Sequence, residues 1–339
     1  MREGSLRVVL VGGGHWHAAR HLDSLTGLGH AIVGVSDPDP NAARRAGEQI
    51  GCPWDQDPVE LIHHLKPDLI MAMGVHQEVS AIVDRLLDTG VPMILEKPLG
   101  RNACEARPLV EKAERKAVFV AVSFPMRYAW IWKRMADLQA AGEFGEISYA
   151  SFRLINGTPE RYRLDSVTWM LDPGLAGGGS LLNLGIHAAG AFLSVAGGAV
   201  QVLSAQTSNK IHRLRIEDYS VAALRSSTGV LGVIESGYSY PAFSGGDMEW
   251  RLVSDGAYLQ QTRDICTLRT MAGRHETERP PSLLDLYRRM TEDAIEQLRR
   301  DKPPPTSMRN CLEAMELIDA IYAAAGPLPF EPRPTGGAS

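Results

Sequence analysis

The sequence predicts two domains: an N-terminal α/β domain built on a doubly wound parallel sheet, and a C-terminal α+β domain with a large, mostly antiparallel, open-faced sheet. The chain has 339 residues, more than one hydrophobic core usually serves. Short apolar strands alternate with helical segments up to residue 122, whereas longer strands of alternating polarity, with few helices, follow residue 146. We therefore expect one domain over residues 1–122 and a second over residues 123–339.

The N-terminal half shows five apolar strands separated by helices. Leu6–Val11 is a short, β-branched run that ends in glycines, as a buried parallel strand before a tight turn would. Apolar residues then recur at helical spacing from Trp16 to Leu28. The same order repeats, with further strands expected at Ala31–Val35, Asp68–Met73, Pro92–Leu95 and Val118–Val122, and further helices from Asn41, Glu78 and Asn102. Regular strand and helix alternation predicts a parallel sheet with helices on both faces.

The C-terminal half has a different rhythm. Its expected strands are Ile147–Leu154, Gln201–Asn209, Tyr219–Ser226, Val230–Ser239 and Glu249–Ser254, and its helices are Leu181–Ala196, Leu283–Arg300 and Met308–Ala325. These few helices should leave one face of the sheet uncovered, and burial against another subunit would remove its apolar side chains from water. We therefore expect a homodimer or homotetramer.

Composition excludes several classes of protein. Apolar residues make up 44% and charged residues 22% of the chain, which argues against a disordered or membrane protein. The net charge is -5 and no long Lys/Arg block occurs, so neither nucleic acid nor a membrane is an expected partner. The four cysteines are widely spaced and form no zinc pattern, so we expect reduced thiols and no metal site. Since Leu6–Gly14 lacks the flanks of a signal peptide, we expect a cytoplasmic protein.

A glycine-rich turn follows the first strand. In the run GGGHWH, Gly12 and Gly14 occupy the first two positions of the dinucleotide-binding fingerprint, and His17 replaces the third glycine. Asp37 ends the second strand, where a carboxylate accepts hydrogen bonds from the adenosine ribose and repels a 2′-phosphate. This favours NAD, while Arg44 and Arg45 leave NADP open. The expected cofactor contacts in this region are Gly12, Gly13, Gly14, His15, Trp16 and Asp37.

A second motif, Glu96-Lys97-Pro98, lies at the carboxyl end of the fourth expected strand, the sheet edge where ligands bind in this architecture. A lysine removed from water beside a positively polarised nicotinamide has a lowered pKa and can exchange a proton with a substrate hydroxyl. A single lysine at a strand end is more often a solvated surface charge. The remaining motifs favour the catalytic interpretation. We expect Pro98 to fix the turn, and a cis Lys97–Pro98 peptide bond is one option.

A third motif, GGGSLLNLGIH, opens a helix and places Asn183 and His187 four residues apart, on one face. One interpretation is a buried histidine satisfied by the asparagine or by backbone. The other is a pair that faces the cleft and orients substrate hydroxyls.

Together, these motifs and the GEFGEI stretch at Gly142–Ile147 resemble the glucose-fructose oxidoreductase, inositol dehydrogenase and MocA family over nearly the whole chain. The resemblance implies an NAD(P)-binding Rossmann domain, a catalytic Lys97 and a His187 that lines the substrate site. The sequence departs from the family pattern at three places: at His17, at Asn183, where many members have Asp, and at Gly74-Val75-His76, where members usually have Thr-Pro-Asn. Gly74, His76, Glu96 and Lys97 complete the expected cofactor contacts. The expected substrate contacts are Arg127, Tyr128, Tyr162, Trp169, Asp172, Asn183 and His187.

The function expected from this resemblance is hydride transfer between a secondary alcohol of a sugar, polyol or sugar derivative and the nicotinamide. Lys97, assisted by His187, would accept the hydroxyl proton. The alternative is a regulatory protein of the same fold that binds NAD(P) without reducing it. The three departures from the family pattern favour that alternative, and the intact Lys97 and His187 argue against it.

Overall fold

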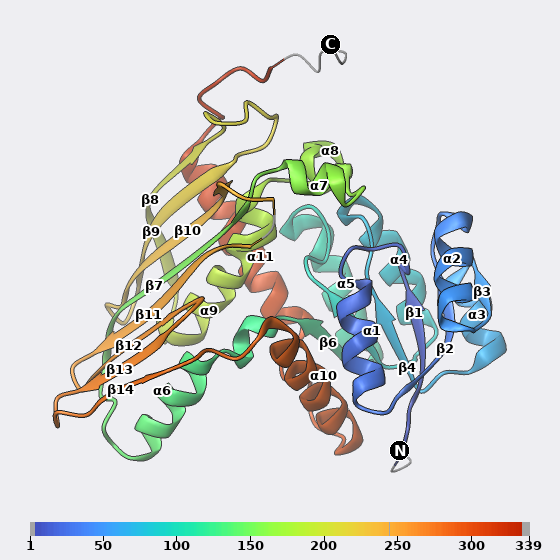
Figure 1. Cartoon of the computed structure of the whole chain (residues 1–339), viewed down its shortest axis with the longest axis horizontal. Coiled ribbons are helices and arrows are strands. Elements are labelled where there is room, and N and C mark those ends of the chain that lie inside the picture. The colour runs from blue at the N-terminus through green and yellow to red at the C-terminus, as the bar shows by residue number, and fades with distance from the viewer. Residues whose placement is uncertain (1–3, 244, 334–339) are drawn as a thin grey trace. The chain divides into compact units, whose positions relative to one another are not determined.

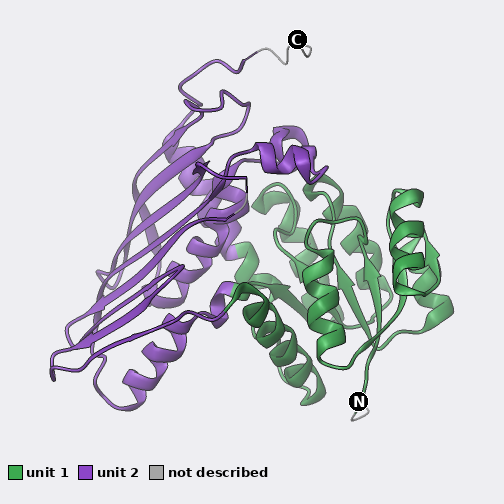
Figure 2. Cartoon of the chain, in the orientation of Figure 1, with its two compact units in different colours: residues 1–125, 282–312 green, residues 126–281, 313–339 purple. Residues whose placement is uncertain are grey.

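The computed structural model describes residues 4–243 and 245–333 and divides the chain into two compact units (Figure 2). Unit 1 comprises Met1–Pro125 and Ser282–Leu312, and unit 2 comprises Met126–Pro281 and Glu313–Ser339. This differs from the expected division at residue 122, because a C-terminal segment returns to the N-terminal domain. Sequence periodicity identifies the helix in that segment, but not the unit against which it packs.

Unit 1 is built on a six-stranded parallel sheet in the order β3-β2-β1-β4-β5-β6 (Figure 1). The strands are β1 (Arg7–Val11), β2 (Ala31–Ser36), β3 (Trp54–Asp55), β4 (Leu69–Ala72), β5 (Met93–Glu96) and β6 (Val120–Ser123). The five expected strands are confirmed, and β3 is an addition of two residues at the edge. The strand order reverses between β1 and β4, and ligands of doubly wound sheets bind beside such a reversal, at the carboxyl ends of the strands.

Three helices of unit 1 begin at a side chain that caps them. Asp39, Asp57 and Asn102 each accept a hydrogen bond from a backbone N–H in the first turn of α2, α3 and α5. These helices connect successive parallel strands, as crossovers of a doubly wound sheet must. The helices of unit 1 are α1 (Ala18–Gly27), α2 (Pro40–Ile50), α3 (Pro58–Leu65), α4 (His76–Asp88), α5 (Ala103–Lys116) and α10 (Leu283–Arg299).

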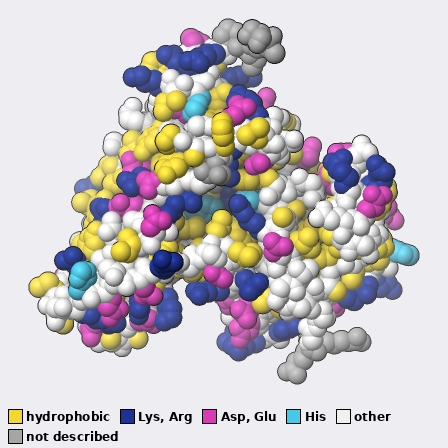
Figure 3. Space-filling model, viewed as in Figure 1, with side chains coloured by type: hydrophobic (Ala, Val, Ile, Leu, Met, Phe, Trp, Pro, Cys, Tyr) yellow, Lys and Arg dark blue, Asp and Glu magenta, His cyan; other side chains and the backbone are white. Residues whose placement is uncertain are grey.

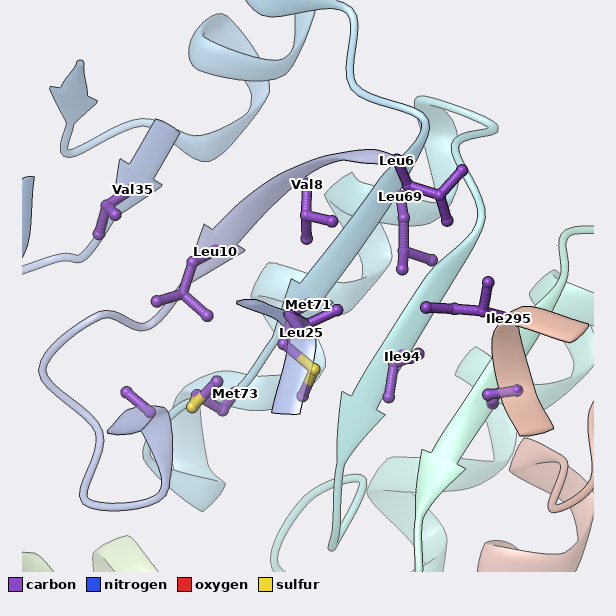
Figure 4. Close-up of a cluster of buried hydrophobic side chains, with 13 residues drawn as sticks. Leu6, Val8, Leu10, Leu25, Val35, Leu69, Met71, Met73, Ile94 and Ile295 are labelled. Atoms are coloured by element: carbon purple, nitrogen blue, oxygen red, sulfur yellow. The ribbon is translucent and has the colours of Figure 1, made fainter. Parts of the chain in front are cut away.

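Helix α10 contributes to the core of unit 1 although it lies about 160 residues beyond β6 in the chain. Ile295, which is 2% exposed, packs in one cluster with Leu6, Leu25 and Ile94 (Figure 4). Helix α10 also packs along α1. The segment 282–312 is therefore part of unit 1 and not of the C-terminal domain.

We expect Ile295→Ala to lower the free energy of unfolding by about 2–4 kcal/mol, because it removes buried methyl groups and leaves a cavity in the core of unit 1. Leu284→Ala on the same helix is the matched control: Leu284 is 40% exposed, and its loss should cost less than about 0.5 kcal/mol. Urea unfolding of both variants measures the difference. Equal effects of the two substitutions would contradict a core role for α10.

Unit 2 contains an eight-stranded sheet in the order β14-β13-β12-β11-β7-β10-β9-β8, in which all neighbours are antiparallel except β7 and β10. Buried and more exposed residues alternate along β9 and β11, so one face of the sheet is covered and the other is open. The strands are β7 (Ile147–Gly157), β8 (Val200–Ser208), β9 (Tyr219–Ser226), β10 (Leu231–Tyr240), β11 (Gly246–Ser254), β12 (Ala257–Thr262), β13 (Cys266–Thr270) and β14 (His275–Glu278). The mostly antiparallel sheet is confirmed.

The helices of unit 2 cover that sheet on one face. Helix α9 packs on β7 and β10, and α6 packs on β11 and β12. The longer helices are α6 (Trp130–Ala140), α9 (Ile186–Ala196) and α11 (Met308–Ala325), whose residues up to Leu312 belong to unit 1. Shorter turns are η1 (Pro125–Tyr128), which spans the unit boundary, α7 (Glu160–Leu164), η2 (Thr168–Leu171), α8 (Pro173–Ala176) and the π-helical turn η3 (Leu181–Gly185).

One helical stretch, Pro173–Ala196, has the length and apolar character of a membrane span, but 83% of its most apolar window is buried inside the protein. A core helix has the same properties. On the face drawn in Figure 3, Lys and Arg side chains lie among Asp and Glu side chains in both units. This mixture differs from the single-sign surface typical of nucleic-acid-binding proteins.

Candidate functional site

The glycine turn after β1 leaves no room for side chains. Gly12 has φ = +85°, and a Cβ there would overlap the carbonyl oxygen of Met73. The amides of Gly12 and Gly13 donate to the Ser36 carbonyl at 2.7 and 3.1 Å, which joins the turn to the end of β2. The turn therefore lies against the carboxyl ends of β2 and β4 and carries no side chains, as the close approach of a pyrophosphate requires.

Asp37 follows β2 and faces this turn. Its Oδ2 accepts a hydrogen bond from the Gly14 amide at 2.8 Å, and its Oδ1 accepts one from the Asp39 amide at 2.9 Å. The carboxylate is thus held beside the glycine turn, where the fingerprint requires an acid for the ribose hydroxyls. The glycine cradle and the fixed acid both fit a dinucleotide.

His17 makes a contact that glycine could not. Its ring stacks on Trp16 at a centroid distance of 4.0 Å, and its Nδ1 lies 3.5 Å from Oε1 of Glu96. His21, one helical turn further along, places its Nε2 2.7 Å from Oε2 of Glu96. His21 is not among the residues expected from the sequence, although its spacing of four residues from His17 is a signal that could have found it.

Lys97 follows β5 and is only 6% exposed, and the Lys97–Pro98 peptide is cis. Burial lowers the pKa of the Lys97 amine, and the neighbouring Glu96 carboxylate opposes that shift. The interpretation of Lys97 as a solvated surface charge is therefore wrong. His76, the first residue of α4, is also buried, and together with His17 it adds to the effect of burial in lowering the pKa of His15. Unit 1 thus brings most of the expected cofactor contacts to one edge of its sheet.

In unit 2, Asn183 is held by two tyrosines. Its amide nitrogen donates to the hydroxyls of Tyr162 and Tyr238 at 3.1 and 3.0 Å, and all three side chains are buried. Burial raises the pKa of both hydroxyls, so both remain protonated. Tyr162 is an expected substrate contact, but its side chain is 0% exposed and offers no ring face to a substrate. Asn183 lies in the π-helical turn η3, and such turns often mark functional sites.

The other predicted substrate contacts occupy several elements of unit 2. His187 lies in α9, one turn after Asn183, and is 9% exposed. Arg127 and Tyr128 are half-buried in η1, and burial lowers the pKa of Arg127. Trp169 is half-buried, whereas Asp172 is exposed and caps α8 by accepting a hydrogen bond from the Gly174 amide at 2.7 Å. Their contacts with substrate stay predictions.

Glu217 is a buried carboxylate that our sequence analysis missed. It accepts hydrogen bonds from the amides of Gly179 and Leu181 at 3.0 and 2.8 Å and from the Tyr322 hydroxyl at 2.8 Å. A Cβ at Gly178 would overlap the Tyr322 hydroxyl, and one at Gly179 would overlap the Glu217 carbonyl oxygen. The glycine run is therefore needed for packing, and Glu217 fixes the start of the helix that carries His187.

Within the described residues, no group of three or more His, Cys, Asp or Glu side chains could hold a metal ion. Two family models match the chain: "Oxidoreductase family, NAD-binding Rossmann fold" over residues 6–124, and "GFO/IDH/MocA C-terminal domain" over residues 132–257. The protein belongs to the Gfo/Idh/MocA oxidoreductase family. Its two matched regions correspond to the parallel sheet of unit 1 and to most of the sheet of unit 2.

Relatives of this Gfo/Idh/MocA chain are distant. It is 26% identical to trans-1,2-dihydrobenzene-1,2-diol dehydrogenase of Mus musculus over 62% of this chain, and it spans 61% of that relative's length. It is 25% identical to D-xylose 1-dehydrogenase (NADP(+)) 2 of Haloferax volcanii, over 87% of this chain and 90% of the relative. A solved levoglucosan dehydrogenase, in complex with NADH and levoglucosan, has the same fold, with a TM-score of 0.85 and 15% identity over 95% of this chain and 97% of that one.

We expect Glu217→Ala to lower the free energy of unfolding of this Gfo/Idh/MocA protein by about 3 kcal/mol, because two buried amides and one buried hydroxyl lose their acceptor. Tyr322→Phe, which removes only one of the three donors, should cost about 1 kcal/mol. Urea unfolding measures both. If Glu217→Ala costs no more than Tyr322→Phe, the carboxylate does not fix the glycine run.

Proposed function

We propose that this protein is an NAD-dependent dehydrogenase that transfers a hydride between a secondary alcohol of a sugar, polyol or sugar derivative and nicotinamide. The observation that carries the proposal is Lys97, a buried amine at the carboxyl end of β5 in a unit of NAD-binding fold. The names of the relatives, which include a xylose dehydrogenase and a dihydrodiol dehydrogenase, support the substrate class.

The residues of this chain would divide the work as follows. Gly12 and Asp37 would hold the pyrophosphate and the ribose of NAD, which supplies the hydride acceptor when bound. Lys97 would accept the hydroxyl proton during oxidation and return it during reduction. Because burial lowers the pKa of Lys97, its neutral form is reached at a lower pH than for a lysine in water. The assistance of His187 rests on the family resemblance.

NAD is favoured over NADP because the Asp37 carboxylate would repel a 2′-phosphate. Arg45 is exposed and lies 4.0 Å from Asp39, so it could still approach a phosphate. Separate activity assays with NAD and with NADP distinguish the two cofactors. We also propose a cytoplasmic location, which the free thiols of all four cysteines support.

We further propose that the protein is a homodimer or homotetramer, formed through the open face of the unit 2 sheet. Val221 and Leu231 on that face are 38% and 47% exposed. Beside them, Arg153 pairs with Glu249 at 3.4 Å, and such a mixture of both charges can complement a second copy of itself. Light scattering of the purified protein measures its mass; a monomer would contradict this proposal.

The experiment that tests the function is a survey of sugars and polyols, each incubated with the purified protein and NAD or NADP while reduced nicotinamide is measured. Reduction with one class of substrate would support the dehydrogenase and identify its cofactor. The alternative regulatory role is favoured by the contact of His17 with Glu96, which departs from the family pattern at the cofactor loop. Tight NAD binding with no reduction across the survey would favour that role.

A further inference from the structure

Glu96 is enclosed at the end of β5 by two histidines from the start of α1. His21 Nε2 lies 2.7 Å from one carboxylate oxygen, and His17 Nδ1 lies 3.5 Å from the other. All three side chains are at most 6% exposed. Because His17 and His21 are four residues apart on consecutive turns, one helix presents a ring to each oxygen.

Helix α10 closes the same cluster from the other side. The Tyr287 ring meets the His21 ring edge-on at a centroid distance of 5.1 Å, and the Arg20 guanidinium lies 5.8 Å from the centre of the Tyr287 ring. The titratable and charged groups of unit 1 that act on Glu96 or on Lys97 come from the cofactor loop, α1, α10 and α11: His15, His17, Arg20, His21, Tyr287 and Cys311.

Glu96 carries the negative charge in this cluster. Burial alone would raise the pKa of its carboxyl, but His17 and the hydrogen bond from His21 more than offset burial and hold that pKa well below its usual value. Burial raises the pKa of Tyr287 and raises that of Cys311 to about 12, so both are uncharged where Lys97 titrates. Burial also lowers the pKa of His17 to about 4, so this ring is neutral there too.

Glu96 is the last residue of β5, and Lys97 is the next residue of the chain. The carboxylate is held on the side of α1 and acts on the amine through space. We propose that His21 is a positioning residue that acts on Lys97 through Glu96: its hydrogen bond keeps the carboxylate as a fixed negative charge, and this charge sets the pH at which Lys97 becomes a proton acceptor.

The direction of the effect follows from the charges. A carboxylate near an amine favours the ammonium form, so Glu96 raises the pKa of Lys97 against the effect of burial. Loss of the Glu96 charge therefore lowers the pH at which Lys97 is half-neutral. Loss of His21 removes the hydrogen bond that keeps Glu96 ionised, so burial raises the pKa of Glu96 and its charge is partly lost.

The experiment is an NMR titration of the Lys97 amine in the full-length protein, with Lys97→Arg used to assign the signal. We expect Glu96→Gln to move the midpoint down by about one pH unit or more. His21→Leu should move it in the same direction by less. His17→Gly, which restores the usual glycine, should leave the midpoint almost unchanged, because the His17 ring is neutral in this pH range. His21→Gln keeps an N–H donor for Glu96 and should leave the midpoint near that of the wild type.

A double variant decides whether the histidine acts through the carboxylate. In the Glu96→Gln background, His21→Leu should cause no further shift; a full further shift, or an unchanged midpoint in the single variants, would overturn the proposal. If His21→Leu does not fold, His21→Ala takes its place in the cycle.

The consequence for catalysis rests on the proposed function, and the titration does not, because it needs no turnover. In the oxidation assay, the rising limb of kcat against pH should move with the NMR midpoint. A midpoint that moves while the limb stays fixed would contradict Lys97 as the acceptor and leave the role of His21 intact.

Discussion

We expect Lys97→Ala to lower kcat for alcohol oxidation by about 10²–10⁴-fold, because general-base catalysis by a positioned side chain contributes a factor of this size. The affinity for NADH should change little, since the glycine turn and Asp37 would carry cofactor binding. A loss in kcat without an equal loss in cofactor affinity identifies an interaction with the reacting atoms. Steady-state kinetics and fluorescence titration with NADH measure the two quantities.

Lys116→Ala is the matched control. Lys116 lies at the end of α5, is 43% exposed through its side chain and pairs with Asp88 on the surface, so its removal should leave kcat unchanged. If kcat and NADH affinity of Lys97→Ala fall by the same factor, Lys97 is a binding or structural residue. Unchanged kcat in Lys97→Ala would exclude it as the proton acceptor.

The parallel sheet of unit 1 could be predicted because its signals are local. Each of β1, β2, β4, β5 and β6 is a short apolar run followed by a turn, and the fingerprint places Gly12 and Asp37 at strand ends. The edge strand β3 has two residues, both exposed, and no periodicity can be detected over that length. The return of α10 could not be predicted, because an amphipathic pattern does not specify the surface against which a helix packs.

Candidate site residues could be identified from sequence where one motif carries several of them, but not where a contact joins distant segments. Lys97 and the glycine turn follow from motifs, whereas the partners of Asn183 are 21 and 55 residues away. Glu217 likewise reaches the glycine run from 36 and 38 residues along the chain. In a single sequence, a buried glutamate and an exposed one look alike, because only tertiary packing removes the side chain from water.

We expect Asp37→Ala to weaken NADH binding by about 10–100-fold. The ribose of NADH would lose its hydrogen bonds to the Asp37 carboxylate, and hydrogen bonds to a charged group contribute about 1.5–3 kcal/mol. NADPH binding should weaken far less or improve, because the repulsion of a 2′-phosphate disappears with the carboxylate. Fluorescence titrations with NADH and NADPH give both dissociation constants, and their ratio is the decisive quantity.

Two further variants separate charge from shape in this turn. Asp37→Asn keeps a side-chain oxygen for the Asp39 amide but removes the charge, so NADPH affinity should rise while NADH affinity falls less than in Asp37→Ala. Asp39→Ala removes an exposed carboxylate two residues away, which caps α2, and should leave the ratio of the two constants unchanged. If Asp39→Ala shifts the ratio as much as Asp37→Ala, the preference arises from the net charge of the loop and not from a contact of Asp37 with the ribose.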